Sequence, residues 1–205
     1  MLKYFLILIL FSTQAFGQRL EIIESFIGYQ EDSEIITFTP NKRILFSGDY
    51  NGNINLWDLE NQALIEKIKA HQSSINSIKF SKKGNLFATC SNDSVVKIWS
   101  FNSNKLIDSI KVHSIPKISL FNKDESGVLI FTKNGDVLEK KFKSKKIKQK
   151  FSKNAQFLDA VLSEDAQSII TCDTQSLKII NYNSGDYISE ISNPTGNIFS
   201  KVEIY

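Results

Sequence analysis

A repeated phrase, clearest in Asn92-Asp93-Ser94-Val95-Val96-Lys97-Ile98-Trp99, dictates the architecture of this chain. The same pattern, a tight polar turn followed by an apolar run that ends in Trp, occurs earlier at Asn51–Asp58. Trp57 and Trp99 are 42 positions apart. A period of this size is typical of an array of copied units, so the whole chain is interpreted as a repeat architecture.

Four copies of the unit can be aligned, and each shows the same order of runs and turns. A short apolar run and a polar turn, such as Lys83-Gly84, lead to a second run rich in Ile, Leu and Phe. A second tight turn follows, and in the third copy it is Asn134-Gly135, a pair that favours a hairpin because both residues tolerate positive φ. A third run, a polar turn and a fourth run such as Leu106–Ile110 complete the copy. The copies occupy residues 28–69, 70–111, 112–153 and 154–193, with a partial fifth at 194–205.

The predicted fold class is therefore all-β, a β-propeller of four-stranded antiparallel blades with about four blades and the start of a fifth. One such sheet cannot bury both of its faces, whereas sheets stacked around an axis cover one another. The predicted ring is incomplete, and three interpretations of the opening remain. The chain is the front part of a longer protein with further C-terminal blades, another chain closes the ring, or the four blades close compactly.

The N-terminus has the pattern of a secretory signal peptide, predicted at residues 1–17. Lys3 precedes the apolar run Tyr4–Phe11, and Ala15-Phe16-Gly17 supplies small residues for cleavage. The run is shorter than the ~20 residues that a membrane span needs, so no integral membrane segment is expected after cleavage. The mature propeller domain is then 18–205, and the expected location is secreted or periplasmic. A formal net charge of +3 is too small to indicate nucleic acid as a partner.

From these residues the chain resembles the WD-repeat family over roughly residues 20–205. Leu56-Trp57-Asp58 contains the dipeptide that names the family, and Trp99 keeps its Trp. The family also has a His about 28 residues before the Trp, and His71 and His113 are 42 positions apart, as the period requires.

The resemblance implies a hydrogen-bonded structural set of His, Ser or Thr, Asp and Trp within a blade. The second copy can supply it with His71, Thr89 or Ser91, Asp93 and Trp99. The choice between Thr89 and Ser91 is open from sequence. The other copies depart from the pattern. The replacements are Tyr29 and Asn51 in the first copy, Asn134 and Lys140 in the third, and Thr174 and Ile180 in the fourth.

No catalytic, metal-binding or cofactor-binding residues are predicted. His71 and His113 have no Cys or acidic partner at ligand spacing. The acidic pairs Asp124-Glu125 and Glu164-Asp165 occupy the same predicted exposed turn of their copies. Cys90 and Cys172 occupy equivalent positions of separate copies, which favours two buried thiols over a disulfide.

A lysine-rich run, Lys140–Lys150, is the one charged anomaly of the sequence. It covers the third and fourth predicted strands of its copy, and lysines on an outermost strand prevent edge-to-edge pairing. The alternative interpretation is a docking patch for an acidic partner or an anionic polymer.

The predicted function is an exported, non-enzymatic scaffold that binds a protein partner of unknown identity. The resemblance implies binding through loops at the end of the ring that carries the His positions. The candidate loop residues are Tyr50, Gln72, Ser74, Asn92 and Lys133. The alternative is a binding module of a larger enzyme whose catalytic domain lies beyond Tyr205, or a hydrolase-type propeller.

Overall fold

The computed structural model describes residues 33–153 and 155–192, and within them the regular elements are all β-strands. Four consecutive strands form each of four antiparallel sheets, here called blades 1 to 4 in chain order. Blade 1 contains β1 (Ser33–Phe38), β2 (Ile44–Asp49), β3 (Asn53–Asp58) and β4 (Ala63–Lys69). Blade 2 contains β5 (Ile75–Phe80), β6 (Leu86–Ser91), β7 (Val95–Ser100) and β8 (Lys105–Lys111). Blade 3 contains β9 (Pro116–Phe121), β10 (Gly127–Thr132), β11 (Asp136–Lys141) and β12 (Ile147–Ser152). Blade 4 contains β13 (Asp159–Leu162), β14 (Ser168–Cys172), β15 (Ser176–Asn181) and β16 (Tyr187–Ser192).

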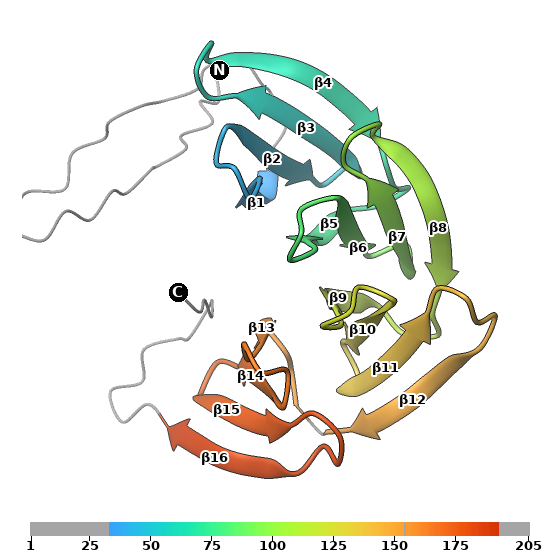
Figure 1. Cartoon of the computed structure of the whole chain (residues 1–205), viewed down its shortest axis with the longest axis vertical. Coiled ribbons are helices and arrows are strands. Elements are labelled where there is room, and N and C mark those ends of the chain that lie inside the picture. The colour runs from blue at the N-terminus through green and yellow to red at the C-terminus, as the bar shows by residue number, and fades with distance from the viewer. Residues whose placement is uncertain (1–32, 154, 193–205) are drawn as a thin grey trace, which may run out of the picture.

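The blades stand around a common axis, with the first strand of each blade innermost and the fourth at the rim (Figure 1). This arrangement confirms the predicted all-β propeller with four-stranded blades. Blades 1 and 4 border an opening, so the compact four-blade closure considered from the sequence is not formed (Figure 1). The predicted signal peptide, the partial fifth copy at 194–205 and Tyr29 lie outside the described residues.

The tight turns between second and third strands owe their shape to residues with positive φ. Gly52 and Gly135 have φ of +82° and +84°, and Ser94 occupies the corresponding turn of blade 2 with φ of +66°. A Cβ atom at Gly135 would collide with the carbonyl oxygen of Lys153. The Asn-Gly turns predicted from sequence therefore also let the chain of the fourth strand pass close by.

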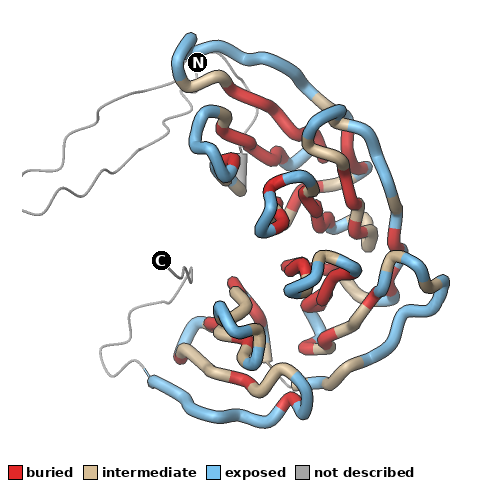
Figure 2. The backbone as a smooth tube through the Cα atoms, viewed as in Figure 1, coloured by how far each residue is buried: buried red, intermediate tan, exposed pale blue. Residues whose placement is uncertain are grey.

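The hydrophobic core lies between neighbouring blades, and Figure 2 shows buried second and third strands against largely exposed outer strands. Phe46 of blade 1 packs edge-to-face on Phe87 of blade 2, with ring centroids 5.2 Å apart. Trp99 stacks on Phe87 at 5.9 Å, and Leu56 of blade 1 belongs to the same cluster. The side chains of neighbouring blades therefore bury one another in a shared cluster.

The exposure of one equivalent position shows how strongly burial depends on a neighbouring blade. Ile110 of β8 pairs with Val96, and Ile191 of β16 pairs with Leu177 in the same register. Ile110 is 3% exposed where blade 3 covers it, whereas Ile191 on blade 4 is 57% exposed. The same residue type at the same place in the blade is thus core or surface according to what packs beside it.

An ion pair joins two blades that are not neighbours. Lys79 Nζ of β5 lies 2.7 Å from Asp159 Oδ1 of β13, and the Asp159 side chain is 9% exposed. The pair links blade 2 to blade 4 close to the axis, where blade 3 presents only its first strand. It therefore ties the first strands of blades 2 and 4 together.

Candidate functional site

Two sets of loops meet at one end of the ring, called the loop end below. They are the turns between second and third strands and the connections from one blade to the next. Antiparallel pairing places both sets at the same end. Backbone hydrogen bonds join them, from Asn92 N–H to Ser74 O at 3.0 Å and from Lys133 N–H to Ile115 O at 2.8 Å. The scaffold thus holds the candidate loop residues in place.

Blade 2 contains a hydrogen-bonded set that runs inward from the loop end. His71 Nδ1 lies 2.9 Å from Asp93 Oδ2, and His71 Nε2 lies 2.7 Å from Thr89 Oγ1. Trp99 Nε1–H donates to the same Thr89 Oγ1 at 3.0 Å. The structure therefore brings Thr89, and not Ser91, together with His71, Asp93 and Trp99.

One proton arrangement satisfies all of these bonds. A neutral His71 donates from Nδ1 to the Asp93 carboxylate and accepts the Thr89 hydroxyl proton at Nε2. Burial lowers the pKa of His71, and the opposing effect of Asp93 does not cancel it. Burial alone would raise the pKa of Asp93, but hydrogen bonds from Gln72 N–H and from His71 outweigh it and hold that pKa below its usual value.

The equivalent positions of the other described copies hold only parts of this set. Trp57 Nε1–H donates to Ser47 Oγ at 2.9 Å in blade 1. Thr171 of blade 4 donates its hydroxyl to the backbone carbonyl of Asp159 at 2.8 Å. His113 is exposed on its loop, unlike the buried His71. Ser91 has a separate role, because its hydroxyl donates to Ser73 O at 2.9 Å and so ties two loops together.

The structure exposes four of the five candidate loop residues and buries the fifth. Tyr50 is 52% exposed, and Gln72, Asn92 and Lys133 are also exposed. Ser74 is 5% exposed, so it lacks the exposure expected of a loop residue. It lies beneath the loop end because its carbonyl oxygen accepts the Asn92 N–H, which draws the Ser74 backbone against the neighbouring turn.

A cavity of about 510 Å³ opens at the loop end and has walls from blades 2, 3 and 4. It is called the loop-end cavity, and its lining residues are Asn76, Lys117, Lys133, Gln156, Phe157 and Leu158. Asn76 Nδ2–H donates to Asn92 Oδ1 at 3.0 Å and to Pro116 O at 2.9 Å, which fixes one wall. Of the lining residues, sequence reasoning identified only Lys133. Leu158 lies just before β13, and its side chain is 41% exposed. An apolar residue in the connection between two blades was the sequence signal that could have identified it.

The other groups that the sequence offered for chemistry are the cysteines, the acidic turns and possible metal ligands. No three His, Cys, Asp or Glu side chains within them are placed to hold a metal ion. Cys90 and Cys172 are free and buried, and burial raises the pKa of Cys90 to about 11, which disfavours the nucleophilic thiolate. Asp124 and Asp165 lie in exposed turns, where hydrogen bonds from Ser126 and Ser163 lower their pKa values.

None of the described residues forms a helix long and apolar enough to cross a bilayer.

Comparisons with known proteins place these features among relatives. A sequence model for the family described as WD domain, G-beta repeat matches residues 24–58 and 62–100. Autophagy-related protein 16 of Arabidopsis thaliana is 27% identical over 82 residues, which are 37% of this chain and 16% of that protein. The solved β-propeller domain of Myceliophteria thermophila Cps50 (Swd1) has a TM-score of 0.70 at 13% identity and matches 86% of this chain and 61% of its own. The chain therefore spans less than two thirds of either relative.

Proposed function

Since the chain belongs to the WD-repeat β-propeller family, we propose that it is an exported scaffold without enzymatic activity that binds a protein partner at its loop end. Propellers of this family are generally protein-interaction scaffolds, because rigid blades present many short loops on a broad surface. The binding part and the export part of the proposal have separate support.

The loop-end cavity carries the binding part of the proposal. It gathers side chains from three blades that are up to 82 positions apart in sequence, from Asn76 to Leu158. Lys117 and Lys133 supply two ammonium groups, and Leu158 supplies exposed apolar surface. Such a mixture of an apolar patch and charged neighbours is typical of the centre and rim of protein interfaces.

The chemistry of the cavity indicates what kind of protein surface it accepts. Lys117, Lys133 and the amide of Gln156 favour carboxylates and carbonyl oxygens, while Leu158 favours an apolar or aromatic side chain. No acidic side chain lines the loop-end cavity in the described part of the chain. The favoured partner surface is therefore an apolar side chain surrounded by acidic or carbonyl groups.

The export part of the proposal rests on Met1–Gly17, whose charged start, apolar run and small residues have the pattern of a signal peptide. Expression in a bacterial host followed by fractionation tests it. We expect the mature protein outside the cytoplasm with an N-terminus near Gln18, and a Leu8→Arg variant to remain inside. Equal export of that variant would contradict this part alone.

A pair of matched double variants tests the binding part. Lys133→Glu with Leu158→Asp changes the loop-end cavity, and Lys82→Glu with Leu64→Asp makes the same changes elsewhere. Leu64 and Leu158 are similarly exposed, at 39% and 41%. Photo-cross-linking from position 156, which lines the cavity and is exposed, should yield a discrete adduct with a protein of the extracytoplasmic fraction. The first double variant should abolish the adduct and the second should retain it, whereas equal loss in both would contradict the proposed site.

A further inference from the structure

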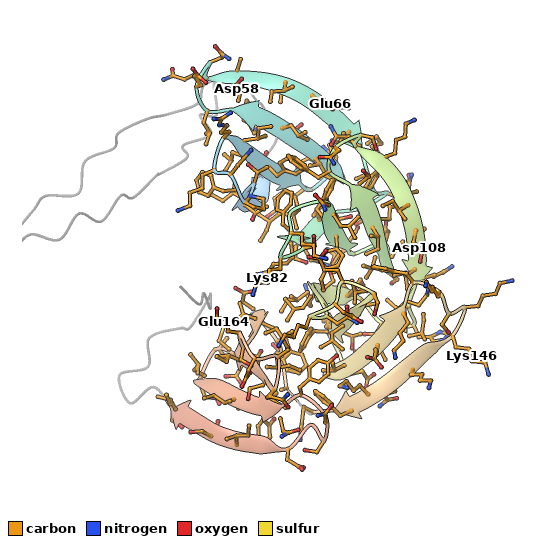
Figure 3. All side chains as sticks on the ribbon, in the orientation of Figure 1. Asp58, Glu66, Lys82, Asp108, Lys146 and Glu164 are labelled. Carbon is orange, nitrogen blue, oxygen red and sulfur yellow. The ribbon has the colours of Figure 1, made fainter. Side chains whose placement is uncertain are left out.

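The lysine-rich run lies on the third and fourth strands of blade 3 and the turn between them, as its sequence predicts, but its lysines differ in burial. Its first lysine, Lys140, is buried between blades 2 and 3, and most of the others are exposed on β12 and the turn before it. Figure 3 shows Asp108 on the blade 2 side of this junction and Lys146 pointing outward from the rim on the blade 3 side. Ile147 and Lys148 are neighbours that point to opposite faces of β12, and both are exposed, so both faces of this strand are open to solvent.

A cavity of about 600 Å³ opens at this junction and is called the rim cavity. Blade 2 contributes Leu86, Ile98, Ile107 and Asp108, and blade 3 contributes Phe142 and the three lysines Lys140, Lys143 and Lys145. Its volume falls within the range of about 300–1,000 Å³ that is typical of ligand sites. Ile107 is 56% exposed at its mouth, the half-buried Leu86 and Phe142 supply the accessible apolar surface of its base, and Ile98 has no exposed surface.

The junction between blades 1 and 2 explains why the rim cavity exists. Trp99 stands there at the place of Lys140 and is 5% exposed. Leu56 lies with it in one cluster, and Ile44 and Phe101 pack against that cluster. By strand register these three residues correspond to Ile98, Leu86 and Phe142 of the rim cavity. A lysine in place of the Trp leaves the equivalent space between blades 2 and 3 only partly filled.

Lys140 also removes the acidic charge of the rim cavity. Its ammonium group lies 3.4 Å from Asp108 Oδ2 and donates to Ser144 O at 2.7 Å and to Lys141 O at 3.1 Å. Asp108 is the one carboxylate among the described residues that line the cavity. With Asp108 paired in this way, the net charge that a ligand meets is positive.

Lys143 and Lys145 are the groups available to a ligand. Both are exposed, and neither ammonium group makes an ion pair with the described part of the chain. The matching turn of blade 2 has Asn102 and Asn104 at these positions, and Asn104 Nδ2–H donates to Glu66 Oε2 at 2.7 Å. The two turns share the pattern Phe-x-Ser-x-Lys, so the lysines of blade 3 are additions to an otherwise equivalent turn.

We propose that the rim cavity binds a short acidic peptide segment that inserts one large apolar side chain between blades 2 and 3. The apolar base accepts the side chain, and Lys143 and Lys145 pair with carboxylates that flank it. A bare phosphate chain would leave the apolar base unused, which is why a peptide is favoured over a polyanion. This site lies on the rim, apart from the loop end, and does not depend on the function proposed above.

Fluorescence anisotropy with defined probes tests this proposal. The first probe is a fluorescein-labelled nonapeptide of alternating Asp and Glu with a central Phe, and the second has Ser in place of the Phe. Inorganic polyphosphate of equal charge is the third ligand, used as a competitor. The full 205-residue chain should bind the Phe probe more tightly than the Ser probe at 0.15 M salt.

Variants that copy the blade 2 residues identify the site. Lys143→Asn with Lys145→Asn should weaken binding of the Phe probe about tenfold, because two charge contacts are lost. Lys140→Trp should fill the cavity and remove the difference between the Phe and Ser probes. The control Lys82→Asn with Lys83→Asn removes the same charge from a distant turn and should change the affinity less than twofold.

Three results would overturn the proposal. The first is that the Lys143→Asn and Lys145→Asn variant binds as the control variant does. The second is that the Phe probe, the Ser probe and polyphosphate bind equally, which would make the rim a general polyanion surface. The third is no saturable binding of the Phe probe by the unmodified chain. Melting curves of the two turn variants should match that of the unmodified chain, since both changes are on exposed side chains.

Discussion

Replacing Thr89 with Val tests the hydrogen-bonded set of blade 2 while leaving the packing nearly unchanged. Val has almost the shape of Thr, and Thr89 is fully buried, so the substitution makes little cavity. What it removes is the hydroxyl group that accepts from Trp99 Nε1 at 3.0 Å and donates to His71 Nε2 at 2.7 Å. Both partners are buried, so water cannot replace the lost group.

The expected cost follows from the two polar atoms left without partners. A buried donor or acceptor without a hydrogen bond costs about 1–3 kcal/mol, so the two together cost about 2–6 kcal/mol. In a domain of this size, 1 kcal/mol corresponds to about 2–4 °C in the melting temperature. Thr89→Val should therefore lower the melting temperature by roughly 4–24 °C.

The equivalent substitution in blade 4 is the matched control. Thr171 also lies on the second strand of its blade, but its hydroxyl makes one bond, to the carbonyl oxygen of Asp159 at 2.8 Å. Thr171→Val should cost about 1 kcal/mol. Thermal unfolding of both variants, followed by circular dichroism and tryptophan fluorescence, measures the difference. The reasoning is refuted if Thr89→Val destabilises the protein no more than Thr171→Val does.

Two further predictions concern charge. Because the pKa of folded His71 is lowered, the unfolded chain takes up a proton first, so stability should be complete above about pH 6.5 and decline as the pH falls below it. Melting temperatures at pH 7.5 and 5.5 measure this decline, which should persist in His113→Asn and shrink in His71→Asn; an unchanged decline in the latter would contradict it. Asp159→Asn should cost about 1–2 kcal/mol by breaking the partly buried pair with Lys79. Hydrogen exchange should then quicken in β14 and β15 and not in blade 1, and no change in blade 4 would rule out the proposed role of the pair.

Several features of the site could be predicted because they depend on local pattern. The spacing of His71, Asp93 and Trp99 is the same in any copy of the repeat, so their positions followed from alignment. The choice between Thr89 and Ser91 did not follow from alignment. The two residues are two positions apart on one strand, so their side chains lie on the same face, and only the side-chain geometry shows which of them contacts His71. The burial of Ser74 did not follow either, because the turn that packs against it, with Asn92 donating to the Ser74 carbonyl oxygen, lies 18 residues away in sequence.

The rim cavity could not be predicted, because it arises from the space between two blades. The sequence identified both of its ingredients, the replacement of the repeat Trp by Lys140 and the lysine-rich run that follows. It did not show that Lys140 pairs with Asp108 of the preceding blade. The loop-end cavity could not be predicted either, since its lining residues come from three separate blades.

The sequence by itself determined the period, the four strands of each blade, the tight turns and the propeller architecture. These depend on interactions within one copy, such as alternation along a strand and turn residues that accept positive φ, and a short pattern records them fully. Tertiary structure alone decided which side chains are buried between blades, how blade 2 is tied to blade 4 and where cavities open. The reason is that each face of a blade is completed by another blade, so the environment of a residue such as Ile110, Ile191 or Lys140 depends on atoms that its own copy does not contain.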